Sequence, residues 1–188
     1  MIRTILNEKN LKDCLHYRIE DAGIEVAVDP KLTKEQYVGI KVDDYYAGLH
    51  QGIIPMSVDF VVPVDCECDS YVLYVLEFKR VGNPPSTREI HQKFDTTMND
   101  FIMSRFKDIF LNSRYKYKSV FLYLLTTAYQ KAAKLGSFKK YEELTRKMKA
   151  KDTLFADSTL SEKPYIFRGK AYYIQREVPP NPFICRMT

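Results

Sequence analysis

The sequence contains no tryptophan, only seven glycines and only four cysteines among its 188 residues. Because 45% of the residues are apolar, the chain has neither the composition of a disordered protein nor the glycine repeat of collagen. It also lacks a run of about 18 apolar residues that could span a membrane, and residues 1–10 lack the apolar core of a signal peptide. We therefore expect a soluble, cytoplasmic (intracellular) protein that does not contact a membrane.

The cysteines argue against two kinds of stabilising site. Four are too few for a disulfide framework in a chain of this length, so we expect reduced thiols. Cys66 and Cys68 are separated by one residue, and Cys14 and Cys185 lie far from them in the sequence. Structural zinc sites favour a CxxC spacing, which this chain lacks. Neither disulfides nor zinc is expected to hold the fold together.

Charge is distributed unevenly along the chain. The formal net charge is +5, but residues 1–100 carry 11 basic and 17 acidic side chains, whereas residues 101–188 carry 18 basic and 7 acidic ones. An acidic segment can supply carboxylates to a divalent cation, and a basic segment attracts a polyanion. The sequence therefore predicts that the two halves contribute different electrostatic functions.

Helical periodicity predicts three helices in a single domain. The first covers residues 7–22, and a long one runs from Ser86 or Thr87, either of which can cap it, to about Phe110. A third, strongly basic helix is predicted over residues 137–151. The long helix is expected to bury Ile90, Phe94, Met98, Phe101, Ile102 and Phe106.

Runs of β-branched and aromatic residues predict strands, of which the first two and the last two form hairpins. The predicted strands are residues 58–64, 71–79, 119–125, 165–167 and 171–174. The third run is so uniformly apolar that it should be a buried central strand, reached from the second strand by a right-handed crossover. The predicted fold is α/β, a mixed central sheet flanked by helices, with its core in about the first two thirds of the chain.

The first hairpin gathers charged residues at its open end. Glu77 and Lys79 are two residues apart in a strand, so their side chains emerge on the same face. If the turn lies symmetrically between the two strands, Asp59 faces Leu76 and lies beside Glu77. Asp65 then belongs to the turn, far from Glu77. A charged pair on an otherwise apolar strand is costly, which indicates a function for it.

Two carboxylates and an ammonium group at one strand end favour metal-dependent chemistry. Asp59 and Glu77, with the backbone carbonyl of Phe78, provide an oxygen-rich pocket for Mg²⁺, which Mn²⁺ can replace. Lys79 would orient or deprotonate the nucleophile and stabilise the transition state. The predicted catalytic residues are thus Asp59, Glu77 and Lys79, and the predicted reaction is hydrolysis of a phosphodiester.

The order of Asp59, a hairpin and Glu77-Phe78-Lys79 resembles the PD-(D/E)XK nuclease superfamily, whose fold is called restriction-endonuclease-like. The similarity covers the order of elements over residues 7–125, although Val58 stands where the motif has proline. The resemblance implies that Gln92, in the following helix, and Glu20, in the first helix, support the site.

Within this superfamily, one small catalytic domain implies a type II restriction endonuclease that acts as a homodimer on double-stranded DNA. The basic half of the chain, residues 126–188 with the segment before them, would contact the phosphates. The predicted DNA-binding residues are Lys116, Lys118, Lys139, Lys140, Arg146, Lys147 and Lys149.

Other interpretations of these residues remain open. Glu77 and Lys79 could form a salt bridge on an exposed sheet face, and the basic helix could simply face solvent. The alternative functions are a junction, repair or RNA endonuclease with the same fold, and a non-catalytic nucleic-acid-binding module. Discrete fragments from duplex DNA favour a restriction enzyme, whereas salt-sensitive binding without cutting favours the module.

Overall fold

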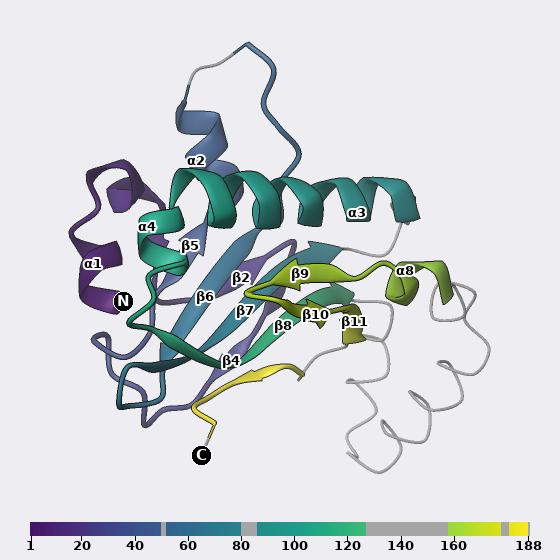
Figure 1. The fold of residues 1–188 in the computed structure, drawn as a ribbon. Coiled ribbons are helices and arrows are strands. Elements are labelled where there is room, and N and C mark those ends of the chain that lie inside the picture. Colours follow the sequence, from purple (N-terminus) through teal and green to yellow (C-terminus); the bar gives the residue numbers. More distant parts are fainter. Residues whose placement is uncertain (50–51, 80–85, 127–157, 178–180, 188) are drawn as a thin grey trace.

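The computed structural model describes residues 1–49, 52–79, 86–126, 158–177 and 181–187. Within these ranges, six strands form a mixed central sheet in the order β1-β5-β6-β7-β8-β11, with helices packed against it (Figure 1). The predicted mixed α/β architecture is therefore confirmed. The six strands are β1 Leu15–His16, β5 Gly39–Lys41, β6 Phe60–Asp65, β7 Ser70–Lys79, β8 Lys116–Thr126 and β11 Ile174–Glu177.

The β6–β7 hairpin is present as predicted, but its register differs by one residue. Phe60, rather than Asp59, pairs with Leu76. The length of the loop causes this shift in register. Cys66 N–H donates to Ser70 O at 2.8 Å, so the loop between the two strands contains only the three residues 67–69. A loop with an odd number of residues shifts the pairing by one position relative to the symmetric turn expected from the sequence.

The long helical segment crosses one face of the sheet (Figure 1). It consists of α3 Thr87–Asp95, the π-helix η2 Thr96–Arg105 and α4 Lys107–Phe110, so its predicted bounds are confirmed but its interior is not a regular α-helix. Ser86 and Glu89 form a capping box at its start, which satisfies two backbone N–H groups. All six predicted core residues are buried, namely Ile90, Phe94, Met98, Phe101, Ile102 and Phe106.

The predicted helix over residues 7–22 is wrong. The chain instead forms α1 Ile2–Leu6 and the 3-10 helix η1 Lys9–Cys14, and it is extended beyond Cys14. Leu15 and His16 pair with Ile40 and Gly39, so a β-ladder with a distant strand replaces the local helical bonds. Helical spacing of apolar residues did not reveal this long-range pairing.

Short strands cover the opposite face of the sheet. They are β2 Glu20–Asp21, β3 Ile24–Glu25, β4 Ala27–Val28 and β12 Phe183–Ile184. Buried Ile19, Ile24 and Ile184 pack there with the side chains of Phe60 and Tyr74. At Gly39, an added Cβ would collide with the Ile19 side chain, so glycine allows this segment to cross the sheet closely.

The remaining elements are strands β8 and β11 of the central sheet, a separate two-stranded hairpin and two short helices. Strand β8 runs parallel to β7, as the crossover predicted, but only one of its faces is fully buried, since Phe121 and Tyr123 are half-buried. The terminal hairpin is confirmed, with β9 Tyr165–Phe167 as predicted. Its second strand, β10 Lys170–Tyr172, begins one residue earlier than predicted and ends before Ile174, which begins β11 and joins β8 in parallel. The helices α2 Val42–Gly48 and α8 Ser158–Glu162 were not predicted. The predicted basic helix over residues 137–151 lies outside the described residues.

None of the helices in the described ranges is long and apolar enough to cross a membrane.

Candidate metal centre

Two buried carboxylates lie at the open end of the β6–β7 hairpin. Leu73 and Val75 pack into the core beneath the helical segment, and Glu77 continues this row on the same face of β7. Asp59 immediately precedes β6. Glu77 is 0% exposed and Asp59 is 7% exposed. Glu77 and Lys79 do form the salt bridge considered from the sequence, but its carboxylate is buried and does not lie on an exposed sheet face.

Backbone hydrogen bonds fix Asp59 in place. Phe78 N–H donates to Asp59 Oδ2 at 2.6 Å, and Val42 N–H donates to the Asp59 carbonyl at 2.9 Å. Val58 N–H donates to Oγ1 of the buried Thr97 in η2 at 3.1 Å, which ties the residue before Asp59 to the helical layer. Phe78 thus contacts Asp59 through its N–H, and a role for its carbonyl as a metal ligand stays a prediction.

Glu77 is paired with two lysines from different elements. Lys79 Nζ, at the end of β7, lies 2.7 Å from Glu77 Oε1. Lys93 Nζ, from α3, lies 2.8 Å from Oε1 and donates to Oε2 at 3.0 Å. The structure therefore brings together the three predicted residues Asp59, Glu77 and Lys79, and it adds Lys93 to them.

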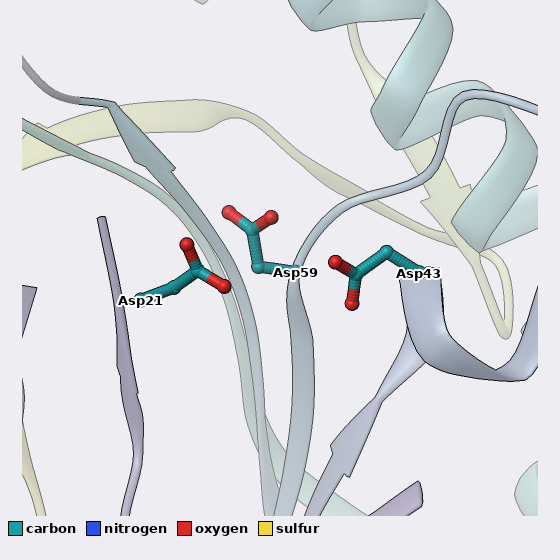
Figure 2. A group of neighbouring side chains, drawn as sticks. All are labelled: Asp21, Asp43 and Asp59. Carbon is teal, nitrogen blue, oxygen red and sulfur yellow. The ribbon is translucent and has the colours of Figure 1, made fainter. Parts of the chain in front are cut away.

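Two further aspartates extend the acidic cluster. Figure 2 shows Asp21 of β2 and Asp43 of α2 converging on Asp59, and ligand atoms of the three carboxylates lie within 4.8 Å of one another. Lys41 Nζ, at the end of β5, is 2.6 Å from Asp21 Oδ2 and 3.4 Å from Asp43 Oδ2. Three carboxylates from separate parts of the chain thus lie close together.

Burial and mutual repulsion shift the proton affinities of this cluster. Burial, together with the charge of Glu77, raises the pKa of Asp59 from its ordinary value to about 8. Burial also raises the pKa of Asp43, with Lys41 opposing this shift. Burial opposes the charge on Lys79, but the carboxylate of Glu77 outweighs it and raises the pKa of Lys79. Asp59 is therefore a carboxyl group that binds a proton at neutral pH.

The donor set fits a hard divalent cation. Among the described residues, no well-directed hydrogen bond reaches the buried oxygens Asp43 Oδ1 and Glu77 Oε1, although two ammonium nitrogens lie within ion-pair distance of the latter. Buried polar atoms ordinarily have a hydrogen-bond partner. Carboxylate oxygens are ligands that Mg²⁺ and Ca²⁺ prefer, and Asp43 Oδ1 is one that accepts no hydrogen bond among the described residues.

Glu20 and Gln92, the two supporting residues that the resemblance implied, do not reach the cluster. Glu20 is exposed and pairs with Arg18 at 3.0 Å, and Gln92 is exposed on α3. In each case the next residue in the sequence, Asp21 or Lys93, is the one that reaches the cluster. Lys93 follows the buried Ile90 by three residues, and this helical spacing was a signal available in the sequence.

The predicted DNA-binding lysines that the structure describes lie elsewhere. Lys116 pairs with Ser70 at the turn end of the hairpin, away from Glu77. Lys118 Nζ donates to the Met187 carbonyl at 2.8 Å. The other five predicted contacts lie outside the described residues, namely Lys139, Lys140, Arg146, Lys147 and Lys149.

Comparison of the chain with protein-family models, with curated protein sequences and with solved structures finds no match in any of the three.

Proposed function

We propose that the protein is a Mg²⁺-dependent endonuclease that hydrolyses phosphodiester bonds in double-stranded DNA. The observation that carries this proposal is the meeting of buried Asp59 and Glu77 with Lys79 at the open end of one hairpin. A fold rarely buries two carboxylates side by side unless a ligand uses them. A divalent cation and a phosphate group are ligands that match this arrangement.

The charge balance of the cluster favours this pair of ligands. Asp21, Asp43, Asp59 and Glu77 supply four carboxylates, and Lys41, Lys79 and Lys93 supply three ammonium groups. With Asp59 protonated, this set is neutral. Binding of a divalent cation with loss of that proton makes the set positive by one charge, which then attracts a phosphate anion.

Each side chain has a defined task in this proposal. The candidate ligands of Mg²⁺ are Asp21, Asp43 and Asp59, whose oxygens lie within 4.8 Å of one another, together with Glu77, whose charge acts on Asp59. Mn²⁺ can replace Mg²⁺ at such ligands. When bound, the cation would acidify a water molecule and offset negative charge on the scissile phosphate. Lys79 is 29% exposed, compared with 16% for Lys93, so Lys79 is better placed to contact the phosphate and orient the attacking water.

The order of these residues supports a finer assignment. Asp59 before a hairpin and Glu77-Phe78-Lys79 at its end resemble the PD-(D/E)XK motif, and a parallel strand follows β7 after a helical crossover. By this resemblance, the protein is a type II restriction enzyme with a restriction-endonuclease-like fold that acts as a homodimer. Each subunit then cuts one strand of a short palindromic site.

Plasmid cleavage tests the proposal directly. The full chain is incubated with supercoiled DNA of mixed sequence, with Mg²⁺ or with EDTA, and the cut ends are sequenced. We expect Mg²⁺-dependent fragments with a common end sequence, and no cutting by Asp59→Asn or Lys79→Ala protein. Cutting by either variant at the wild-type rate would overturn the assignment of the site.

The same assay separates the related functions. If the protein cuts RNA or branched DNA but leaves intact duplex DNA uncut, it is a nuclease of another specificity and not a restriction enzyme. Salt-sensitive DNA binding by a folded protein that never cuts with Mg²⁺ or Mn²⁺ overturns the enzymatic proposal.

A further inference from the structure

We propose that the two lysines on Glu77 have different tasks. Lys93 is a positioning residue that stays on Glu77, whereas Lys79 leaves Glu77 when a divalent cation binds and so becomes available to the phosphate. This inference rests on the proposed function and deepens it, because it assigns the rearrangement that prepares the site for its substrate.

The contacts of the two ammonium groups differ. Lys93 Nζ reaches both oxygens of Glu77, at 2.8 Å from Oε1 and 3.0 Å from Oε2. Lys79 Nζ lies 2.7 Å from Oε1, and among the described residues it forms no hydrogen bond to Oε2. Lys79 therefore gives up fewer contacts than Lys93 when either of them moves away.

The two lysines also differ in how firmly their backbones are held. Lys93 lies inside α3, which is capped by Ser86 and anchored by the buried side chains of Ile90 and Phe94. Lys79 is the last residue of β7, and its side chain is the more exposed of the two. Movement of Lys79 needs only a change of side-chain rotamer toward solvent, whereas Lys93 sits in the packed helical layer.

When a divalent cation binds this cluster, we expect one of the two lysines to leave Glu77. Without it, Glu77 is completely buried and needs the positive charge beside it. An incoming divalent cation supplies part of that charge and repels both ammonium groups, so Glu77 keeps one lysine and releases the other. The lysine with one contact and an exposed side chain is then the one released, while the other continues to orient Glu77.

Chemical labelling of lysines measures this rearrangement without DNA. The 188-residue chain is treated with a limiting amount of an acetylating reagent, with and without Mg²⁺, and the acetylation of each lysine is followed by mass spectrometry. Lys12, which is exposed on η1, serves as the reference. We expect Mg²⁺ to raise the labelling rate of Lys79 several-fold relative to Lys12 and to leave Lys93 protected.

Two variants test the dependence of Lys79 on Lys93. In Lys93→Met protein, Lys79 is the remaining lysine partner of Glu77 and should stay on it. We therefore expect that Mg²⁺ no longer raises the labelling rate of Lys79, and that kcat falls about tenfold. Lys93→Arg, which keeps a positive charge that can reach both oxygens, should restore the response. Lys79→Arg should lower kcat about 100-fold or more and leave KM for DNA nearly unchanged.

The outcomes distinguish this inference from the proposed function. Calorimetry that shows no Mg²⁺ binding overturns both. Binding of Mg²⁺ with an unchanged Lys79, or with Lys93 exposed in its place, overturns the division of tasks and leaves the nuclease proposal standing. If Mg²⁺ still raises the labelling rate of Lys79 in Lys93→Met protein, the division of tasks is likewise overturned and the nuclease proposal stands. If that variant does not fold, the wild-type labelling and the Lys93→Arg variant still decide the question.

Discussion

The two ends of the β6–β7 hairpin carry similar residue types in opposite environments. At the turn end, Asp69 pairs with Arg114 at 2.9 Å and Glu67 pairs with Arg186 at 2.8 Å, and all four side chains are at least partly exposed. At the open end, Glu77 is completely buried. Both ends are neutralised by basic residues, but only one of them removes its carboxylates from water.

This difference separates residues that serve solubility from those that serve a function. Exposed ion pairs form in high dielectric and contribute little to folding. A buried carboxylate costs several kcal/mol in lost hydration, which an ion pair only partly offsets. Folding alone therefore gives no reason to retain Asp59 beside Glu77, whereas a bound cation does.

The largest expected effect is on catalysis. Asp59→Asn keeps the size of the side chain and an oxygen that accepts from Phe78 N–H, but it removes a charged ligand. We expect the cleavage rate with Mg²⁺ to fall by about 10³-fold or more. The matched variant at the turn end, Asp69→Asn, should cut at the wild-type rate. Equal losses in the two variants would mean that the open end has no special role.

The next effect is on the pH dependence of cation binding. Because burial and Glu77 raise the pKa of Asp59 to about 8, the cation must displace a proton below that pH. The apparent Mg²⁺ affinity should rise about tenfold per pH unit up to about pH 8 and then level off. Calorimetry in two buffers of different ionisation enthalpy measures the released proton. An affinity that is independent of pH would contradict a protonated Asp59.

A smaller effect is expected on the stability of the metal-free protein. The raised pKa means that the folded state holds the Asp59 proton more tightly than the unfolded state, so wild-type stability falls as pH rises from about 4 to 8. Asp59→Asn should remove this loss and increase the free energy of unfolding at neutral pH by about 1–2 kcal/mol. Urea unfolding in EDTA checks this. The gain should disappear near pH 4, where both states bind the proton.

The smallest effect is expected at the turn end. Arg114→Ala removes the partner of Asp69 in an exposed pair, which solvent already screens. Thermal unfolding should show a change in Tm of no more than about 2 °C, which vanishes at high salt. A large, salt-resistant loss would erase the contrast between the two ends.

The sequence was sufficient for the parts of the site that lie on one regular element. Period two placed Glu77 and Lys79 on one face of β7, and the capping residue with its apolar stripe located the start of α3. These patterns act within a few residues, where local geometry decides which side chains share a face.

The site residues that were not predicted from the sequence depend on contacts between distant segments. Asp21 reaches Asp59 because Leu15 and His16 join β5, and the periodicity of the N-terminal residues gave no sign of that ladder. Asp43 reaches the cluster from α2, which follows β5 directly. Tertiary pairing overrode the local helical preference of residues 7–22, and the resemblance to the nuclease superfamily had assigned Glu20, instead of Asp21, to the site.

Thermal unfolding with and without Mg²⁺ tests most directly the claim that the open end of the hairpin holds a divalent cation. A cation at about 100 times its Kd should raise the Tm of the wild-type protein by about 5–10 °C. The Asp59→Asn variant should respond little, and the Asp69→Asn variant should respond like the wild type. Equal shifts in all three proteins, or no shift in the wild type, would show that the buried carboxylates are not a cation site.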